Sequence, residues 1–276
     1  MENRDITLSD SDLSFLAEVV PVKSERKGKL RLLIGEDEAF RDALIGDDRV
    51  FSRVMDDEES FLRISPQLYF EILLRKTRRQ LKEAAYTIER SGREKVPVFD
   101  MGEVFEFLSR NSVLIYLSGM LASFTRVESY SISYPVRRGI WRTIRYSDLN
   151  IDSLKKYAEW VDEGQRLGIY RRIGDVCLFT VGIFPEFAHF SMHYPASGEL
   201  RPRFPGQFGH TMDEYEREGK KFYESAAEHP AAKEAGLSEV FGLLHDYFNA
   251  AKKPLNFLSE HYLHYRRSYL FGVEGS

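Results

Sequence analysis

Apolar residues recur at spacings of three and four along most of the chain, a pattern that predicts helices. The clearest example is "SPQLYFEILLRKTRRQLKE", which starts at Ser65. Ser65 is a good helix N-cap, and Pro66 suits the first helical position. Leu68, Tyr69, Ile72 and Leu73 share one side of this helix, and Arg75, Arg78, Arg79 and Lys82 form a basic face on the other.

The segment "VLIYLSGMLASF" (113–124) is apolar nearly all round. Such a helix is expected to be buried on all sides. It should therefore lie at the centre of the core, with these residues buried: Leu114, Ile115, Leu117, Leu121 and Phe124.

Between residues 127 and 146 the spacing changes to two. Tyr130, Ile132 and Tyr134 alternate with serines, and Ile140, Ile144 and Tyr146 follow after an Arg-Arg-Gly turn. Alternation of this kind predicts a short β-hairpin, near 128–146, and Pro135 would confine it to a sheet edge.

Helical spacing resumes after residue 150. We expect a helix over 165–184, a long loop over 195–210, and a capping box of Thr211 and Glu214 that starts the next helix. Ser238 should cap a further helix, and Lys253-Pro254 should open the last one. There Leu255, Leu258, Tyr262, Tyr265 and Tyr269 repeat at three and four, as a packing seam does.

These patterns predict a mainly α protein: a multi-helix globular core with a short β-hairpin near 128–146. We divide the chain into an acidic N-terminal helical segment (1–65) and a helical core domain (66–276) that contains the hairpin and the 195–210 loop. The hydrophobic content of 43% and charged content of 30% are typical of a soluble globular protein.

The surroundings of the protein are predicted from what the sequence lacks. No secretory signal precedes the first helix, and no apolar run reaches the roughly 18 to 20 residues of a membrane span. The single cysteine, Cys177, permits no internal disulfide and fits a reducing compartment. We therefore expect a cytoplasmic protein that does not enter membranes.

Charge is distributed unevenly. Residues 1–66 carry 10 basic and 16 acidic groups, residues 67–145 carry 14 and 8, and residues 146–276 carry 15 and 19. The basic middle third predicts either an anionic partner or internal pairing with the acidic first third. Arginine outnumbers lysine eleven to three there, which favours recognition by planar guanidinium groups.

The leading hypothesis is a non-catalytic helical interaction protein that recognises nucleic acid or an acidic protein surface. Arginines around a tryptophan are typical of nucleic-acid binders, although the isoelectric point near 6.0 disfavours a dedicated DNA binder. The candidate binding residues are Arg75, Arg78, Arg79, Lys82, Arg137, Arg138, Trp141, Arg142 and Arg145.

An enzyme is the less favoured hypothesis, because the sequence contains no phosphate loop, dinucleotide-binding glycine pattern or Gly-x-Ser-x-Gly elbow. We expect no cofactor and no metal. His189, His193 and His210 form a weak alternative metal site, since the first two would share a helix face.

The alternative hypothesis is an enzyme or ligand-binding protein with a pocket between the 165–184 helix and the 195–210 loop. Long loops in compact domains are often functional, and Arg201 and Arg203 are suited to hold a carboxylate or phosphate. Neither a substrate nor an oligomeric state follows from the sequence.

Overall fold

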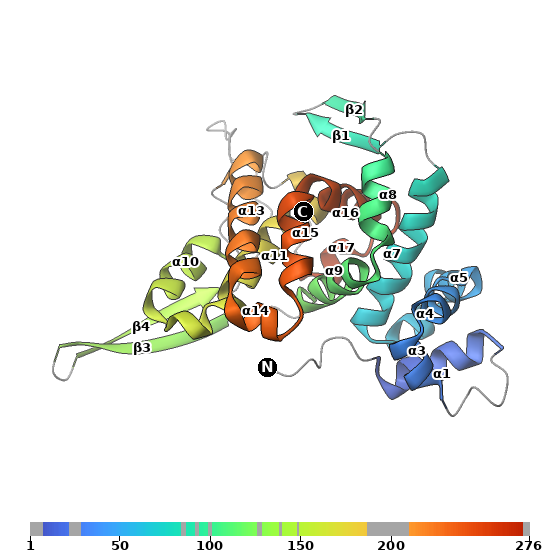
Figure 1. Ribbon diagram of the computed structural model, residues 1–276, viewed down its shortest axis with the longest axis horizontal. Helices are drawn as coiled ribbons and strands as arrows, with labels where there is room; N and C mark the ends of the chain where they lie inside the picture. The colour runs from blue at the N-terminus through green and yellow to red at the C-terminus, as the bar shows by residue number, and fades with distance from the viewer. Residues whose placement is uncertain are drawn as a thin grey trace. The chain divides into compact units, whose positions relative to one another are not determined.

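The computed structural model (Figure 1) describes residues 8–21, 29–83, 87–91, 94–98, 101–125, 129–137, 140–147, 149–186 and 210–272. The chain divides into two compact units, Met1–Ser123 and Phe124–Ser276. Helices form the core of both units, which confirms the α-helical prediction. The division at residue 65, based on charge, stays a prediction.

Unit 1 is built around one long helix. Short helices precede α7. Two more helices follow it, and each of these contacts both α7 and the other. The helices are α1 (Asp10–Val19), α3 (Leu30–Glu36), α4 (Glu38–Ile45), α5 (Asp48–Asp56), α6 (Glu58–Arg63), α7 (Pro66–Glu83), α8 (Met101–Ser109) and α9 (Asn111–Ser123).

α7 begins where the sequence predicts. The Ser65 hydroxyl accepts a hydrogen bond from the Leu68 amide at 3.1 Å, and Pro66 is the first helical residue. Asp12, which the sequence analysis did not single out, joins this start to α1. Its buried carboxylate accepts from the amides of Ser9 (2.9 Å) and Ser65 (2.7 Å). Amides at a helix start have no partner within the helix, so the bond from the Ser65 amide to Asp12 ties the start of α7 to α1.

α9 is the buried helix that the apolar segment predicts. Leu114, Leu117, Leu121 and Phe124 are buried, whereas Ile115 is partly exposed, so the prediction for Ile115 is wrong. The helix starts at Asn111, two residues before the apolar segment. Gln67 of α7 donates to the Ser118 hydroxyl at 2.9 Å, which links the two helices.

Four strands are assigned by their backbones. β1 (Thr87–Ser91) pairs antiparallel with β2 (Glu94–Val98), and β3 (Ser129–Arg137) with β4 (Ile140–Ser147). The side chains of these strands and the turn at 138–139 lie outside the described residues. The hairpin near 128–146 therefore stays a prediction.

Unit 2 is a helical bundle. Its helices are α10 (Ile151–Trp160), the short 3-10 helix η2 (Glu163–Gln165), α11 (Leu167–Ile183), α13 (Met212–Glu228), α14 (Pro230–Glu234), α15 (Ser238–Asp246), α16 (Phe248–His261) and α17 (Arg267–Leu270). α11 is the central one and packs against α10, α13 and α16. The predicted capping box of Thr211 and Glu214 starts α13.

Glycines bring the helices of unit 2 close together. A β-carbon on Gly219 of α13 would lie 2.6 Å from Phe248 Cζ and 3.0 Å from Cys177 Cβ. One on Gly174 of α11 would lie 2.9 Å from the Tyr223 ring, and one on Gly182 would lie 2.7 Å from Leu255 Cβ. Separations under 3 Å are too short for carbon atoms, so at these glycines a side chain of the neighbouring helix lies directly against the backbone of α11 or α13.

Replacing Gly219 with alanine is expected to lower the free energy of unfolding of unit 2 by about 1 to 3 kcal/mol, as overpacking does. Chemical denaturation monitored by circular dichroism would measure it. Gly242→Ala in α15 is the matched control, since a β-carbon there meets nothing within 4 Å. It should stabilise by about 0.5 to 1 kcal/mol through helix propensity. Equal effects of the two substitutions would contradict the close packing.

Two predictions for the last helices are wrong. Pro254 does not open a helix but lies inside α16, and Ser238 is the first residue of α15, where its hydroxyl donates to the Ala227 carbonyl at 2.7 Å instead of capping. The predicted tyrosine seam also ends early, because Tyr265 and Tyr269 are 95% and 77% exposed.

Over the part of the chain that the structure describes, no helix combines the length and the apolar character needed to cross a membrane.

Candidate functional site

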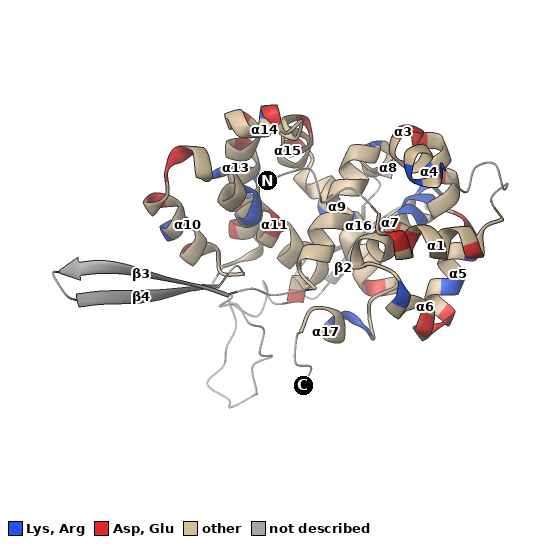
Figure 2. Ribbon diagram, turned by 90° about the horizontal axis from the view of Figure 1, so that it is seen from below, with Lys and Arg blue, Asp and Glu red and all other residues tan. Residues whose placement is uncertain are grey.

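The basic face of α7 lies against two of the helices that precede it, α4 and α5. α4 and α5 both contact α7 (Figure 1), and all three helices carry charged residues of both signs (Figure 2). We call the group formed by Arg41, Asp42, Glu71, Arg75 and Arg78 the α7 charge cluster.

Glu71 is the centre of the α7 charge cluster and is fully buried. Arg41 of α4 donates to both of its oxygens, from Nε at 2.8 Å and from Nη2 at 2.6 Å. Arg75, one helical turn along α7, donates to Glu71 Oε1 from Nη2 at 2.7 Å. A paired arrangement of this kind is what makes burial of charged groups tolerable.

Asp42 forms the outer part of the cluster. One of its oxygens, Oδ1, accepts from Arg75 Nη1 and also from Arg78 Nη2. The Asp42 side chain is 36% exposed, that of Arg78 12%, and that of Arg75 0%. The two guanidinium groups therefore converge on a single carboxylate oxygen that lies near solvent.

These contacts set the protonation of both acids. Burial by itself raises the pKa of Asp42, but the charges and hydrogen bonds of Arg75 and Arg78 outweigh it, so its pKa lies below the usual value. The pKa of Glu71 is lowered in the same way, where the hydrogen bond and charge of Arg41 and the charge of Arg75 outweigh burial. Both acids are ionised at neutral pH, and the cluster then holds three arginines and two carboxylates.

The remaining basic residues of α7 lie nearer the surface. Lys76 donates to Asp48 of α5 at 2.8 Å, and Arg79 lies 3.6 Å from the same carboxylate oxygen. The side chain of Arg79 is 39% exposed. Lys82 is exposed, and its ammonium lies 5.5 Å from the centre of the Phe105 ring.

For α7, the structure thus contains the internal pairing that the charge distribution predicted as one possibility. Arg75 and Arg78 pair with Asp42, and Arg79 lies near Asp48, all within the acidic first third. Recognition of a partner by these residues stays a prediction. The side chains of Arg137, Arg138, Trp141, Arg142 and Arg145 lie outside the described residues.

The alternative site near residue 200 is only partly described. His189, His193, Arg201 and Arg203 lie outside the described residues, as does nearly all of the 195–210 loop. His210 does lie within them, and its Nε2 is 3.0 Å from Asp152 Oδ2. Within the described ranges no three possible metal-binding side chains gather, and the expectation of no metal stays a prediction.

The predicted 165–184 helix corresponds to α11, with η2 just before it. Residues 173–183 of α11 are buried. Its Asp175 accepts from the Tyr223 hydroxyl at 2.8 Å, and burial raises the pKa of the Cys177 thiol, which makes it a poor nucleophile. These contacts are those of a packed core helix.

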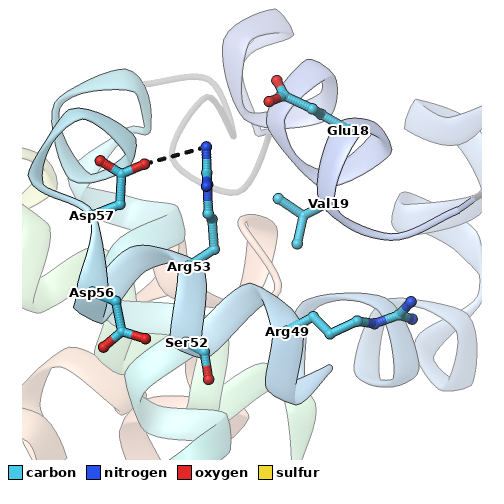
Figure 3. Close-up of a pocket in the computed structure, with 7 residues that line it drawn as sticks. All are labelled: Glu18, Val19, Arg49, Ser52, Arg53, Asp56 and Asp57. Carbon is cyan, nitrogen blue, oxygen red and sulfur yellow. Dashed lines mark ion pairs between the residues drawn. The ribbon is translucent and has the colours of Figure 1, made fainter.

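An open depression lies between α1 and α5 (Figure 3). Its volume is about 680 Å³, and it is lined by Glu18, Val19, Arg49, Ser52, Arg53, Asp56 and Asp57. Arg53 points toward Asp57, and its Nη2 lies 3.3 Å from Asp57 Oδ2. Arg49 points away from Asp57, and its Nη2 lies 2.8 Å from Asp47 Oδ2. The lining charges are of both signs and do not converge on one point, so the depression indicates no ligand class.

Sequence reasoning missed three members of the α7 charge cluster, namely Arg41, Asp42 and Glu71. Glu71 and Arg75 are four residues apart on one helix, a spacing at which side chains meet, and this signal was available in the sequence. Arg41 and Asp42 gave no such signal, because they are separated from α7 by about thirty residues of chain and meet it only through the fold.

Comparisons of the chain with protein-family models, curated proteins and solved structures found no match.

Proposed function

We propose that this chain is a non-catalytic interaction protein that recognises an acidic protein surface through the arginines of α7. The observation that supports this proposal is the contact between Arg75, Arg78 and Asp42, in which two guanidinium groups hold one carboxylate oxygen near the surface. Guanidinium groups suit carboxylates because of their planar, multiple donors. This contact supports the proposal that the same face of α7 binds acidic side chains of a partner.

An acidic protein is favoured over nucleic acid for two reasons. The group that α7 holds within its own chain is a carboxylate on a helix, not a phosphate. The chain also carries a net charge of −4, and its long-range repulsion is stronger for a duplex with its densely charged backbone than for an acidic protein segment with a few carboxylates. Nucleic acid remains the other anionic partner against which the proposal is tested.

We also propose that residues 128–146 form a short β-hairpin at a sheet edge and that this hairpin carries a second group of basic residues. Arg137, Arg138, Arg142 and Arg145 around Trp141 would form that group, and it belongs to unit 2, whereas α7 belongs to unit 1. Substitutions in the two groups are therefore to be tested separately.

Arg79→Ala with Lys82→Ala is expected to weaken binding of a short poly-glutamate peptide by roughly 2- to 30-fold. This follows from about 0.2 to 1 kcal/mol per exposed charge. Both residues are more exposed than Arg75 and Arg78, so the protein should stay folded. Fluorescence anisotropy with a labelled peptide, at low and at physiological salt, would measure the change.

Arg217→Ala with Lys221→Ala is the matched control, because both residues are exposed on α13 of unit 2 and the change in net charge is the same. This pair should leave peptide binding unchanged. Binding of an RNA or DNA oligonucleotide but not of poly-glutamate would contradict the proposed partner, and so would equal losses in the two double variants.

A further inference from the structure

Asp42 differs from Glu71 in how firmly the α7 charge cluster holds it. Glu71 is fully buried and accepts from Arg41 and Arg75 with both oxygens. Asp42 is 36% exposed, and within the described ranges only its Oδ1 accepts from arginine. Its carboxylate therefore has a direct path to solvent, whereas that of Glu71 does not.

Asp42 can leave its arginines without movement of its helix. The residues around it on α4, namely Arg41, Leu44 and Ile45, are buried and hold that helix in place. Rotation of one short side chain would then be enough to expose Arg78 and the outer nitrogen of Arg75. Such rotations of exposed side chains take picoseconds to nanoseconds once the hydrogen bonds break.

Arg75 and Arg78 would remain positively charged after Asp42 leaves, and Arg75 would remain ordered. Arg41 and Arg75 would still share the Glu71 carboxylate, and Arg78 would be left to pair with a new one. Arg75 would keep its bond to Glu71 at 2.7 Å, and the Asn111 side-chain oxygen lies 3.5 Å from its Nη1. The uncovered site would be preorganised for another carboxylate, which reduces the ordering cost of binding.

We propose that Asp42 is an internal competitor, which occupies the carboxylate site of Arg75 and Arg78 in the free protein and is displaced by an acidic segment of the partner. This inference rests on the proposed function and adds its regulation. A tethered competitor is present at high effective concentration, so a single free carboxylate would not displace it. Only a segment with several acidic side chains, held also by Arg79 and Lys82, would do so.

The test compares Asp42→Asn with the wild-type chain, with a short poly-glutamate peptide as the probe. If the site is open in about a tenth of the molecules, loss of the competitor tightens the apparent Kd about tenfold. Asp213→Asn is the matched control, since Asp213 is exposed on α13 of unit 2 and the change in net charge is identical. It should tighten binding much less, and equal gains in the two variants would overturn the inference.

A second measurement needs no substitution at Asp42. The carboxyl carbon of Asp42, observed by NMR in the wild-type protein, should shift on saturation with poly-glutamate as its hydrogen bonds to arginine are lost. An unchanged Asp42 signal in a protein that binds the peptide would overturn the inference and leave the proposed function standing. If poly-glutamate binds neither the wild type nor either variant, both the proposed function and the inference are wrong.

Discussion

Replacing Glu71 with alanine is expected to lower the free energy of unfolding of unit 1 by about 3 to 5 kcal/mol, the cost of breaking a buried ion pair from one side. Arg41 and Arg75 would lose the carboxylate that both contact, although their side chains are only 5% and 0% exposed. The cost arises because these charges stay buried, and it does not measure the net value of the intact pair.

Urea denaturation followed by circular dichroism would measure this effect. Glu106→Ala is the control, since Glu106 is 77% exposed and its oxygen lies 3.7 Å from Arg110 in an ordinary surface pair. It should cost less than about 1 kcal/mol. If the two substitutions lower the free energy of unfolding equally, the buried α7 charge cluster contributes no more to stability than a surface ion pair does.

The pH profile of the same variant gives the sign of the electrostatic contribution. Because the pKa of Glu71 is lowered in the folded protein, its contribution is present above the unfolded value of about 4.3 and is lost as pH falls through the lower folded value. The wild type should therefore lose stability more steeply below about pH 4 than Glu71→Ala does. Parallel profiles would contradict this assignment.

Replacing Phe179 with alanine should destabilise unit 2 by about 3 to 5 kcal/mol, the usual cost of removing a buried aromatic ring. The Phe179 ring stacks on Phe124 with centroids 4.0 Å apart. It also meets Phe184 and Phe271 edge-on at 5.6 Å and 4.9 Å. These contacts join residues from the beginning, middle and end of unit 2, so no single helix can collapse into the cavity.

Thermal and urea unfolding would measure the loss, with Tyr265→Ala as the control. Tyr265 is 95% exposed, and its removal should change stability by no more than about 0.5 kcal/mol. A small effect of Phe179→Ala, close to that of the control, would mean that the aromatic cluster is not the centre of unit 2.

Helix starts with local side-chain caps could be predicted from the sequence. Ser65 with Pro66, and Thr211 with Glu214, begin α7 and α13 as expected, because a capping side chain and the amides that it accepts from are at most three residues apart. The long basic helix and the buried apolar helix followed from periodicity for the same reason.

Features that depend on distant residues could not be predicted. Pro254 lies within α16, and Tyr265 leaves the seam, although local rules favour the opposite in both cases. For the candidate site, the sequence predicted the basic face of α7 but left open whether an external partner or the acidic first third covers it. That choice depends on where Asp42 lies in space, which spacing along the chain does not determine.

The glycine contacts of unit 2 also restrict how this sequence can diverge. Gly182 faces Leu255, and Gly219 faces Phe248, at separations that leave no room for one added carbon. A larger residue at either glycine becomes acceptable only if the facing side chain shrinks at the same time. Drift at these positions is therefore expected to occur as coupled pairs, in which the combined volume of the two facing residues is kept nearly constant.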